Sequence, residues 1–266
     1  MRITLPVLVL ALAAPSARAL GPTPLEKAEE VVGTAKSGMR CNGSSAVGPE
    51  LMQFLDKAPG VSVIVAAGGP LIRVDEIDAD IPVRTIVFNP LIGGASPRYA
   101  AYLLAEKAAE LKLADMPDTA EKRFMVLSYA ARAWLELGGQ RAQLPDFDGV
   151  RDPKTADKIE VWTSNSMAAY VRDQGARGVP TLDSLIRTNG AKIAASQVQV
   201  ALYTQRFMLA RDDGEERGWL AQRDQENARL AELVKIDQRL KEQQAEARKF
   251  QADELDWLMA NAGTMQ

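Results

Sequence analysis

The stretch SPRYAAYLLAEKAAEL, residues 96–111, decides the fold class of this chain. Ser96 followed by Pro97 is a helix cap with a first-turn proline, a frequent start of an α-helix. Apolar side chains then recur at intervals of three and four residues, which places them on one helical face. The spacing predicts an amphipathic helix packed on a core, and the side chains of its apolar face are Tyr99, Leu103, Leu104, Ala108 and Leu111.

The segment that follows repeats this pattern. Residues 118–121, DTAE, form a capping box, and the helix that they open should stop at Gly138-Gly139. We expect the two helices to form an antiparallel pair, because a short connection joins them. The apolar face of the second helix consists of Phe124, Leu127, Ala131, Trp134 and Leu135.

Two β-branched runs precede these helices. VSVIV at 61–65 and PVRTIVF at 82–88 are predicted strands. The segment 68–81 between them predicts a loop, so the strands either pair as a long-looped hairpin or lie apart. The sequence therefore predicts an α+β fold that is predominantly α-helical, with a small two-strand β element and a long C-terminal helix.

The C-terminal part has a mainly helical pattern, with helices expected near 155–172 and 189–211 and a short turn between them at 182–187. Residues 215–262 contain no proline, which predicts one helix about 72 Å long. Its apolar residues keep coiled-coil (heptad) spacing only in patches, since Asp237 and Gln244 fall on the seam. We expect no strict coiled coil, but a helix whose ends dock on a core or a partner. The domain prediction is a mainly helical globular domain at 20–211 and a long C-terminal helix at 212–266.

The first 19 residues have the features of a signal peptide. Arg2 supplies the positive start, residues 5–14 are almost wholly apolar, and Ala17-Arg18-Ala19 predicts cleavage after Ala19. We therefore expect a periplasmic or secreted protein with no membrane span after signal cleavage, because the apolar run is too short to cross a bilayer.

Composition excludes several kinds of chemistry. The 266 residues include no histidine and one cysteine, so Ser-His and Cys-His catalysis, histidine-bound zinc and an internal disulfide are all excluded. Without Arg2 and Arg18 the formal charge of −3 becomes −5, which argues against a nucleic-acid partner. No nucleotide-binding loop is present, and we expect no cofactor.

The order of elements over residues 48–139 resembles that of bacterial zinc metallopeptidases of the zincin type. In that family a helix carries His-Glu-x-x-His, and here the corresponding stretch contains Glu106-Lys107-Ala-Ala-Glu110. Glu106 and Glu110 stand where the resemblance places two metal-binding histidines, and Lys107 stands where it places the catalytic glutamate. An ammonium group repels a metal and cannot activate water, so the resemblance implies an inactive pseudo-metallopeptidase. On the next helix, Glu136 is the acid nearest to the ligand position.

We therefore expect a secreted or periplasmic, non-catalytic protein that binds a protein or peptide, with no catalytic residue and no metal ligand assigned. Arg98, Tyr99 and Tyr102 are candidates to line a groove under the strand at 83–88. One alternative is a structural or assembly protein that forms homo-oligomers through residues 215–262. Another is a metal-dependent hydrolase with carboxylate ligands. In the simplest interpretation, Glu106, Lys107 and Glu110 form only the solvent face of an amphipathic helix.

Overall fold

The computed structural model describes residues 21–41, 47–66, 78–80, 84–139, 146–147, 150–151, 162 and 166–261. The expected signal peptide at 1–19 lies outside the described residues. The α+β, mostly helical fold class is confirmed, as is the long C-terminal helix. The described elements are α1 (Pro24–Cys41), α2 (Val47–Lys57), β1 (Ser62–Val65), β2 (Asp78–Asp80), β3 (Thr85–Phe88), the 3-10 helix η1 (Pro90–Gly94), α3 (Pro97–Lys112), α4 (Ala120–Glu136), β4 (Asp146–Phe147), β5 (Val150–Arg151), α6 (Met167–Ala176), α7 (Leu182–Met208) and α8 (Asp213–Asn261).

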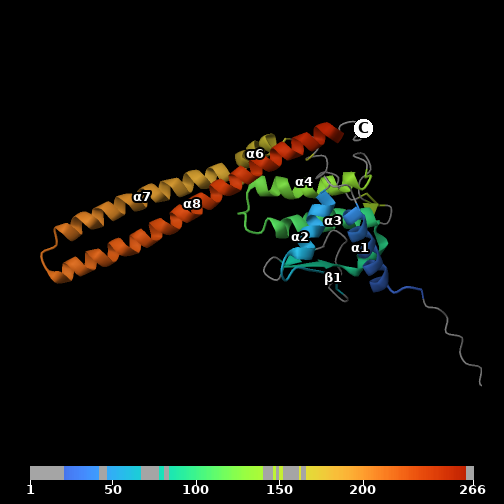
Figure 1. The fold of residues 1–266 in the computed structure, drawn as a ribbon, viewed down its shortest axis with the longest axis horizontal. Helices are drawn as coiled ribbons and strands as arrows, with labels where there is room; N and C mark the ends of the chain where they lie inside the picture. The colour runs from blue at the N-terminus through green and yellow to red at the C-terminus, as the bar shows by residue number, and fades with distance from the viewer. Residues whose placement is uncertain are drawn as a thin grey trace, which may run out of the picture.

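α3 and α4 pack against each other as the expected antiparallel pair (Figure 1). Ser96 caps α3 by accepting a hydrogen bond from the Tyr99 N–H at 3.1 Å, and the Thr119 hydroxyl caps α4. α3 is buried on more than the one face that the sequence predicts, because α1, α2 and the sheet cover it as well as α4. Alanines allow this close packing on several sides, and Ala100, Ala101, Ala105, Ala108 and Ala109 are fully buried.

α1 and α2 cross close together on one side of α3. α1 continues to Cys41, into the glycine- and serine-rich stretch at 37–48 that predicts a loop, because Met39 is fully buried in the core. A Cβ on Gly48 would lie 2.6 Å from the carbonyl oxygen of Met39, so only glycine permits this crossing. Tertiary packing here outweighs a local preference for a loop.

The small sheet has the strand order β1-β3-β2. β1 pairs with β3 in parallel, so the two strands that the sequence predicts do not form a hairpin. β2 adds antiparallel to the other side of β3, within a segment expected to be a loop. Edge pairing uses main-chain hydrogen bonds and needs no apolar side chain, which explains why the sequence pattern missed it. Ile86 and Phe88 of β3 are fully buried beneath the helices.

α7 and α8 form a long helical hairpin that projects from the rest of the molecule (Figure 1). We call these two helices the arm, and the described residues from 21 to 176 the body. The domain boundary expected between 211 and 212 falls in the turn that joins the two helices, so the arm includes α7 as well as α8. The short turn expected at 182–187 is instead the first part of α7, because Thr181 and Ser184 form a capping box there.

Burial in the arm follows a seven-residue repeat along its full length. The apolar residues of α8 keep heptad spacing only in patches, as the sequence predicts, but burial continues between the patches because polar residues occupy seam positions. Asn189 donates to the Leu233 carbonyl at 2.8 Å, and Ser196 donates to Glu226 at 2.6 Å. Polar seam contacts of this kind set the register of a coiled coil. The less exposed residues of α8 form two rows with seven-residue spacing. The first row is Trp219, Glu226, Leu233, Leu240, Ala247 and Glu254, and the second is Arg223, Leu230, Asp237, Gln244, Gln251 and Leu258.

The last third of α8 packs on the body. Gln243 donates to the Asp115 carbonyl at 2.8 Å, and the Trp257 ring lies 6.0 Å from that of Trp162. The guanidinium of Arg132, on α4, stacks 4.8 Å from the Trp257 ring. α8 therefore ties the arm to α4. No helix in the described part of the chain has both the length and the apolar character needed to cross a membrane.

Candidate binding groove

A groove of about 430 Å³ lies between α3, α4 and α6. Glu106 and Glu110 contribute to its α3 wall, because residues four apart share one helical face. Both side chains are half-buried rather than fully in solvent. The structure thus brings two of the three motif positions together at one concave surface. The described lining residues are Tyr102, Glu106, Glu110, Asp118, Lys122, Arg123, Val126, Leu127 and Tyr170.

Lys107 forms an ion pair with Glu110. Its ammonium donates to both carboxylate oxygens, at 3.0 and 3.1 Å, and both side chains are largely shielded from water. A cation that approached Glu110 would compete with this ammonium. Among the described residues, no group of three or more acidic, histidine or cysteine side chains is placed to hold a metal ion.

The basic side chains of the opposite wall are held by neighbours. Arg123 donates to both carboxylate oxygens of Asp118, at 2.9 and 2.6 Å, and these bonds lower the pKa of Asp118. Lys122 donates to the carbonyl of Met116 at 3.0 Å. Arg123 is therefore neutralised by Asp118, whereas Lys122 keeps its positive charge, so the groove carries charged groups of both signs.

The remaining lining is aromatic and apolar. Tyr170 of α6 packs on Phe124 at 5.4 Å between ring centroids, and Val126 and Leu127 are half-buried beside it. Burial raises the pKa of Tyr170, so its hydroxyl stays neutral at physiological pH. The groove thus combines an apolar wall with carboxylates, which is the usual makeup of a small binding site.

The three residues expected to line a groove under the strand at 83–88 lie in different surroundings. Tyr99 and Tyr102 are buried with their rings stacked 6.3 Å apart, and Tyr102 lines the groove beside Glu106. Arg98 donates to the Leu137 carbonyl at 3.0 Å and stacks 5.4 Å from Trp134. Arg98 and Tyr99 therefore face the core and the end of α4.

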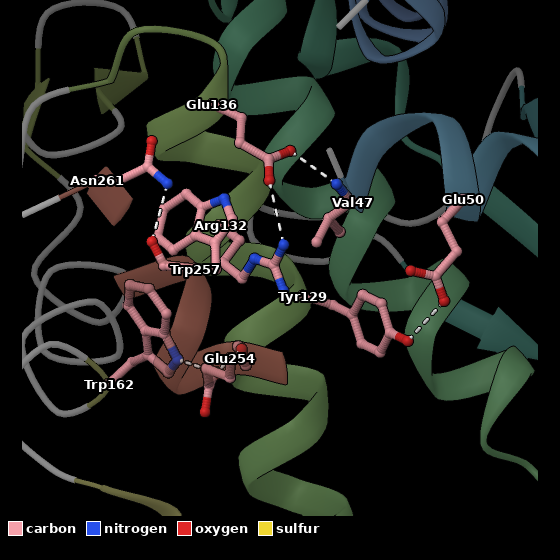
Figure 2. A network of polar contacts seen from close by, with 10 residues as sticks. Val47, Glu50, Tyr129, Arg132, Glu136, Trp162, Glu254, Trp257 and Asn261 are labelled. Carbon is pink, nitrogen blue, oxygen red and sulfur yellow. Dashed lines mark hydrogen bonds and ion pairs between the residues drawn. The ribbon is translucent and has the colours of Figure 1, made fainter. Parts of the chain in front are cut away.

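A buried polar cluster joins α8 to α4, and sequence reasoning missed it (Figure 2). Glu254 is almost fully buried, and accepts hydrogen bonds from the Ser128 hydroxyl and, at 2.7 Å, from the Trp162 indole. Burial raises the pKa of Glu254 to about 7, against the opposing effects of Trp162 and Arg132. The sequence signal that could have found it is the seven-residue spacing of Leu233, Leu240 and Ala247, in which Glu254 occupies the next, normally apolar, position.

Glu136, the nearest acid to the expected ligand position, has a structural role in the same region. It accepts a hydrogen bond from the Val47 N–H, at the start of α2, at 2.9 Å, and lies 3.6 Å from the Arg132 guanidinium. A carboxylate at a helix N-terminus is favourable because the helix dipole is positive there. Burial raises the pKa of Glu136. Glu136 therefore joins α4 to α2.

A hydrogen-bonded chain links α2, α3 and α4, and Figure 2 shows the part of it that joins Tyr129 to Glu50. The Tyr129 hydroxyl donates to Glu50 at 2.9 Å and receives a hydrogen bond from Lys112 at 2.9 Å. Burial raises the pKa of Tyr129 to about 12, and Lys112 also pairs with Glu50. This chain is satisfied internally and lies outside the groove.

The chain matches no known family model, no curated protein and no solved structure.

Proposed function

We propose that this protein is a non-catalytic binding protein that holds a peptide segment of a partner protein in the groove between α3, α4 and α6. The observation that carries the proposal is the ion pair between Lys107 and Glu110, two of the three motif positions. Glu110 is bound by Lys107 at 3.0 Å, so the position of a general base carries an ammonium that is engaged with the neighbouring carboxylate. The groove is concave, and its lining combines charged, aromatic and aliphatic side chains.

The lining supports a particular kind of peptide. Val126, Leu127 and Tyr170 offer apolar and aromatic contacts, while Glu106 and Glu110 supply carboxylate oxygens at the α3 wall, where Lys107 already pairs with Glu110. Lys122 and Arg123 are engaged with neighbouring oxygens. A peptide with an apolar side chain next to a lysine or arginine fits this pattern, because its cation would meet the carboxylates in a partly shielded site.

Fluorescence anisotropy of labelled hexapeptides tests the proposal. The panel holds a central leucine constant and places lysine, alanine or glutamate beside it. We expect the lysine peptides to bind most tightly and the glutamate peptides most weakly. Glu106→Gln should weaken binding of the lysine peptides about tenfold, since a charged contact is lost. Glu232→Gln on the exposed surface of the arm is the matched control and should bind normally.

Equal affinity for the three peptides, or no effect of Glu106→Gln, would contradict the peptide-binding proposal. The hydrolase alternative has a separate readout. A stoichiometric zinc ion that raises the melting temperature, together with chelator-sensitive cleavage of the same peptides, would favour a hydrolase. The non-catalytic proposal expects neither effect.

We also propose that the protein is periplasmic or secreted, as the N-terminal pattern predicts. Purification from the expressing cells should then yield a chain that begins at Leu20. Intact mass and N-terminal sequencing measure this directly. A chain that retains Arg2 and Arg18 would contradict export by the expected cleavage.

A further inference from the structure

The α4 wall of the groove carries a cation that is not neutralised by a carboxylate. Lys122 donates to the Met116 carbonyl at 3.0 Å, and it forms no ion pair with any residue in the described part of the chain. Its neighbour Arg123 differs, because Asp118 pairs with it at 2.6 Å. The Lys122 side chain is half-buried at the concave surface. Its ammonium therefore favours an anion as the ligand group that enters beside it.

α6 supplies a second hydrogen-bond donor to the groove. The Tyr170 hydroxyl makes no hydrogen bond to another described residue, and its ring is held against Phe124 at 5.4 Å. Burial raises the pKa of Tyr170, while the nearby charge of Arg123 partly lowers it, so the hydroxyl stays protonated and can donate. An ionised carboxylate only accepts hydrogen bonds. An ammonium and a phenol hydroxyl in one groove are therefore suitable partners for a carboxylate.

The groove is closed where α4 begins. The turn at 113–119 joins α3 to α4 there. The segment between α6 and α7 returns to the same point, because the Ala120 N–H donates to the Pro180 carbonyl at 2.9 Å. Lys122 lies on the first turn of α4 and therefore at this closed end. A peptide that runs along the groove toward Lys122 has to stop or turn back there.

We propose that the groove binds the carboxyl-terminal end of the partner's chain, with the terminal carboxylate on the Lys122 ammonium and the Tyr170 hydroxyl. This inference rests on the proposed peptide-binding function and specifies which part of the partner enters the groove. An internal peptide segment has no terminal carboxylate to offer Lys122 and would have to turn at the closed end. The last side chains of the bound end then lie along Val126, Leu127 and Glu106, in keeping with the apolar and basic residues of the proposed peptide.

Fluorescence anisotropy with three labelled peptides tests the inference. All carry the label at the amino terminus and contain the same lysine and leucine near the other end. The first has a free carboxyl terminus, the second an amidated one, and the third is amidated with an added aspartate as its last residue. The first peptide should bind at least about tenfold more tightly than either of the others, because only its terminal carboxylate reaches Lys122.

Variants of the full mature protein identify the groups that hold the carboxylate. Lys122→Met should remove the preference, so that the free and amidated peptides bind within about twofold of each other. Tyr170→Phe should reduce the preference about threefold, because one neutral hydrogen bond is lost. Lys192→Met, at an exposed position of α7, is the matched control and should keep the full preference. Melting temperatures show whether each variant is folded.

Equal affinity of the wild type for the free and amidated peptides would overturn this inference. An amidated aspartate peptide that binds as tightly as the free peptide would also overturn it, because a side-chain carboxylate would then suffice. The proposed function survives both results if lysine peptides still bind more tightly than glutamate peptides. A preference that persists in Lys122→Met would overturn the role of Lys122. Absence of binding by every peptide would overturn the proposed function and this inference together.

Discussion

The body and the arm of this protein are held together by different means. In the body, α3 is buried on several sides by apolar neighbours, and its fully buried side chains are mostly alanine, leucine and tyrosine. In the arm, two helices meet along one seam, and several seam positions carry polar side chains such as Asn189 and Ser196. The body therefore gains its stability mainly from burial, whereas the arm combines partial burial with specific hydrogen bonds.

This difference explains how α8 contacts both α7 and the body. Its polar seam residues bond to α7, and its last third packs on the body. A fully apolar seam would pair in more than one register, whereas a side-chain hydrogen bond such as that from Ser196 to Glu226 favours a single one. Register matters here because it decides whether Glu254 reaches Ser128 and Trp162.

The largest effect is expected from the same substitution made in each region. Leu104→Ala in α3 should lower the free energy of unfolding by about 3–4 kcal/mol, because the side chain is fully buried. Leu230→Ala in the arm should cost only about 1–2 kcal/mol, since part of its side chain already meets water. Urea denaturation followed by circular dichroism measures both. Equal losses would remove the contrast between the body and the arm.

A pH-dependent effect is expected where the two regions meet. The Glu254 carboxyl ionises near pH 4.5 when unfolded and near pH 7 when folded, so the folded state binds more protons between these values. Its contribution to stability is therefore fully present below pH 4.5 and is lost as pH rises through 7, by up to about 3 kcal/mol. Glu254→Gln should remove this loss.

The measurement is the melting temperature of wild type and Glu254→Gln at pH 5 and pH 8. The variant should be the more stable protein at pH 8, with a much smaller difference at pH 5. A variant that is destabilised at pH 8 would show that the charged form of Glu254 holds α8 on the body. Glu242→Gln, at an exposed position of α8, serves as the control.

The smallest effect is expected from the arm seam. Ser196→Ala removes the hydrogen bond to Glu226 and should cost about 1 kcal/mol, because Glu226 keeps a contact with Arg229 at 3.5 Å. Hydrogen exchange should quicken in the arm and stay unchanged in α3 and α4. Gln197→Ala, on the exposed side of α7, should change neither. Faster exchange throughout the body would show that the two regions unfold together.

Local patterns predicted much of the body. The Ser96-Pro97 start of α3 and the Thr119 start of α4 were readable because a cap depends on a few adjacent residues. The strands at 62–65 and 85–88 were readable from β-branched residues, but their parallel pairing was not, because pairing joins distant segments. The candidate site divides in the same way. Glu106 and Glu110 were singled out by the resemblance to the metallopeptidase motif, whereas Tyr170 of α6 joins them only through the packing of α6 on α4.

By itself the sequence determined the helical character of the chain, the starts of its main helices, the long C-terminal helix and the absence of histidine chemistry. These properties depend on composition and on side chains within a few residues of one another. Tertiary structure alone decided that α7 pairs with α8, that Glu254 is buried against α4, and that α7 leaves an apolar face in solvent. These features depend on which surfaces meet, and burial changes both the energy and the pKa of a side chain in ways that its sequence neighbours do not show.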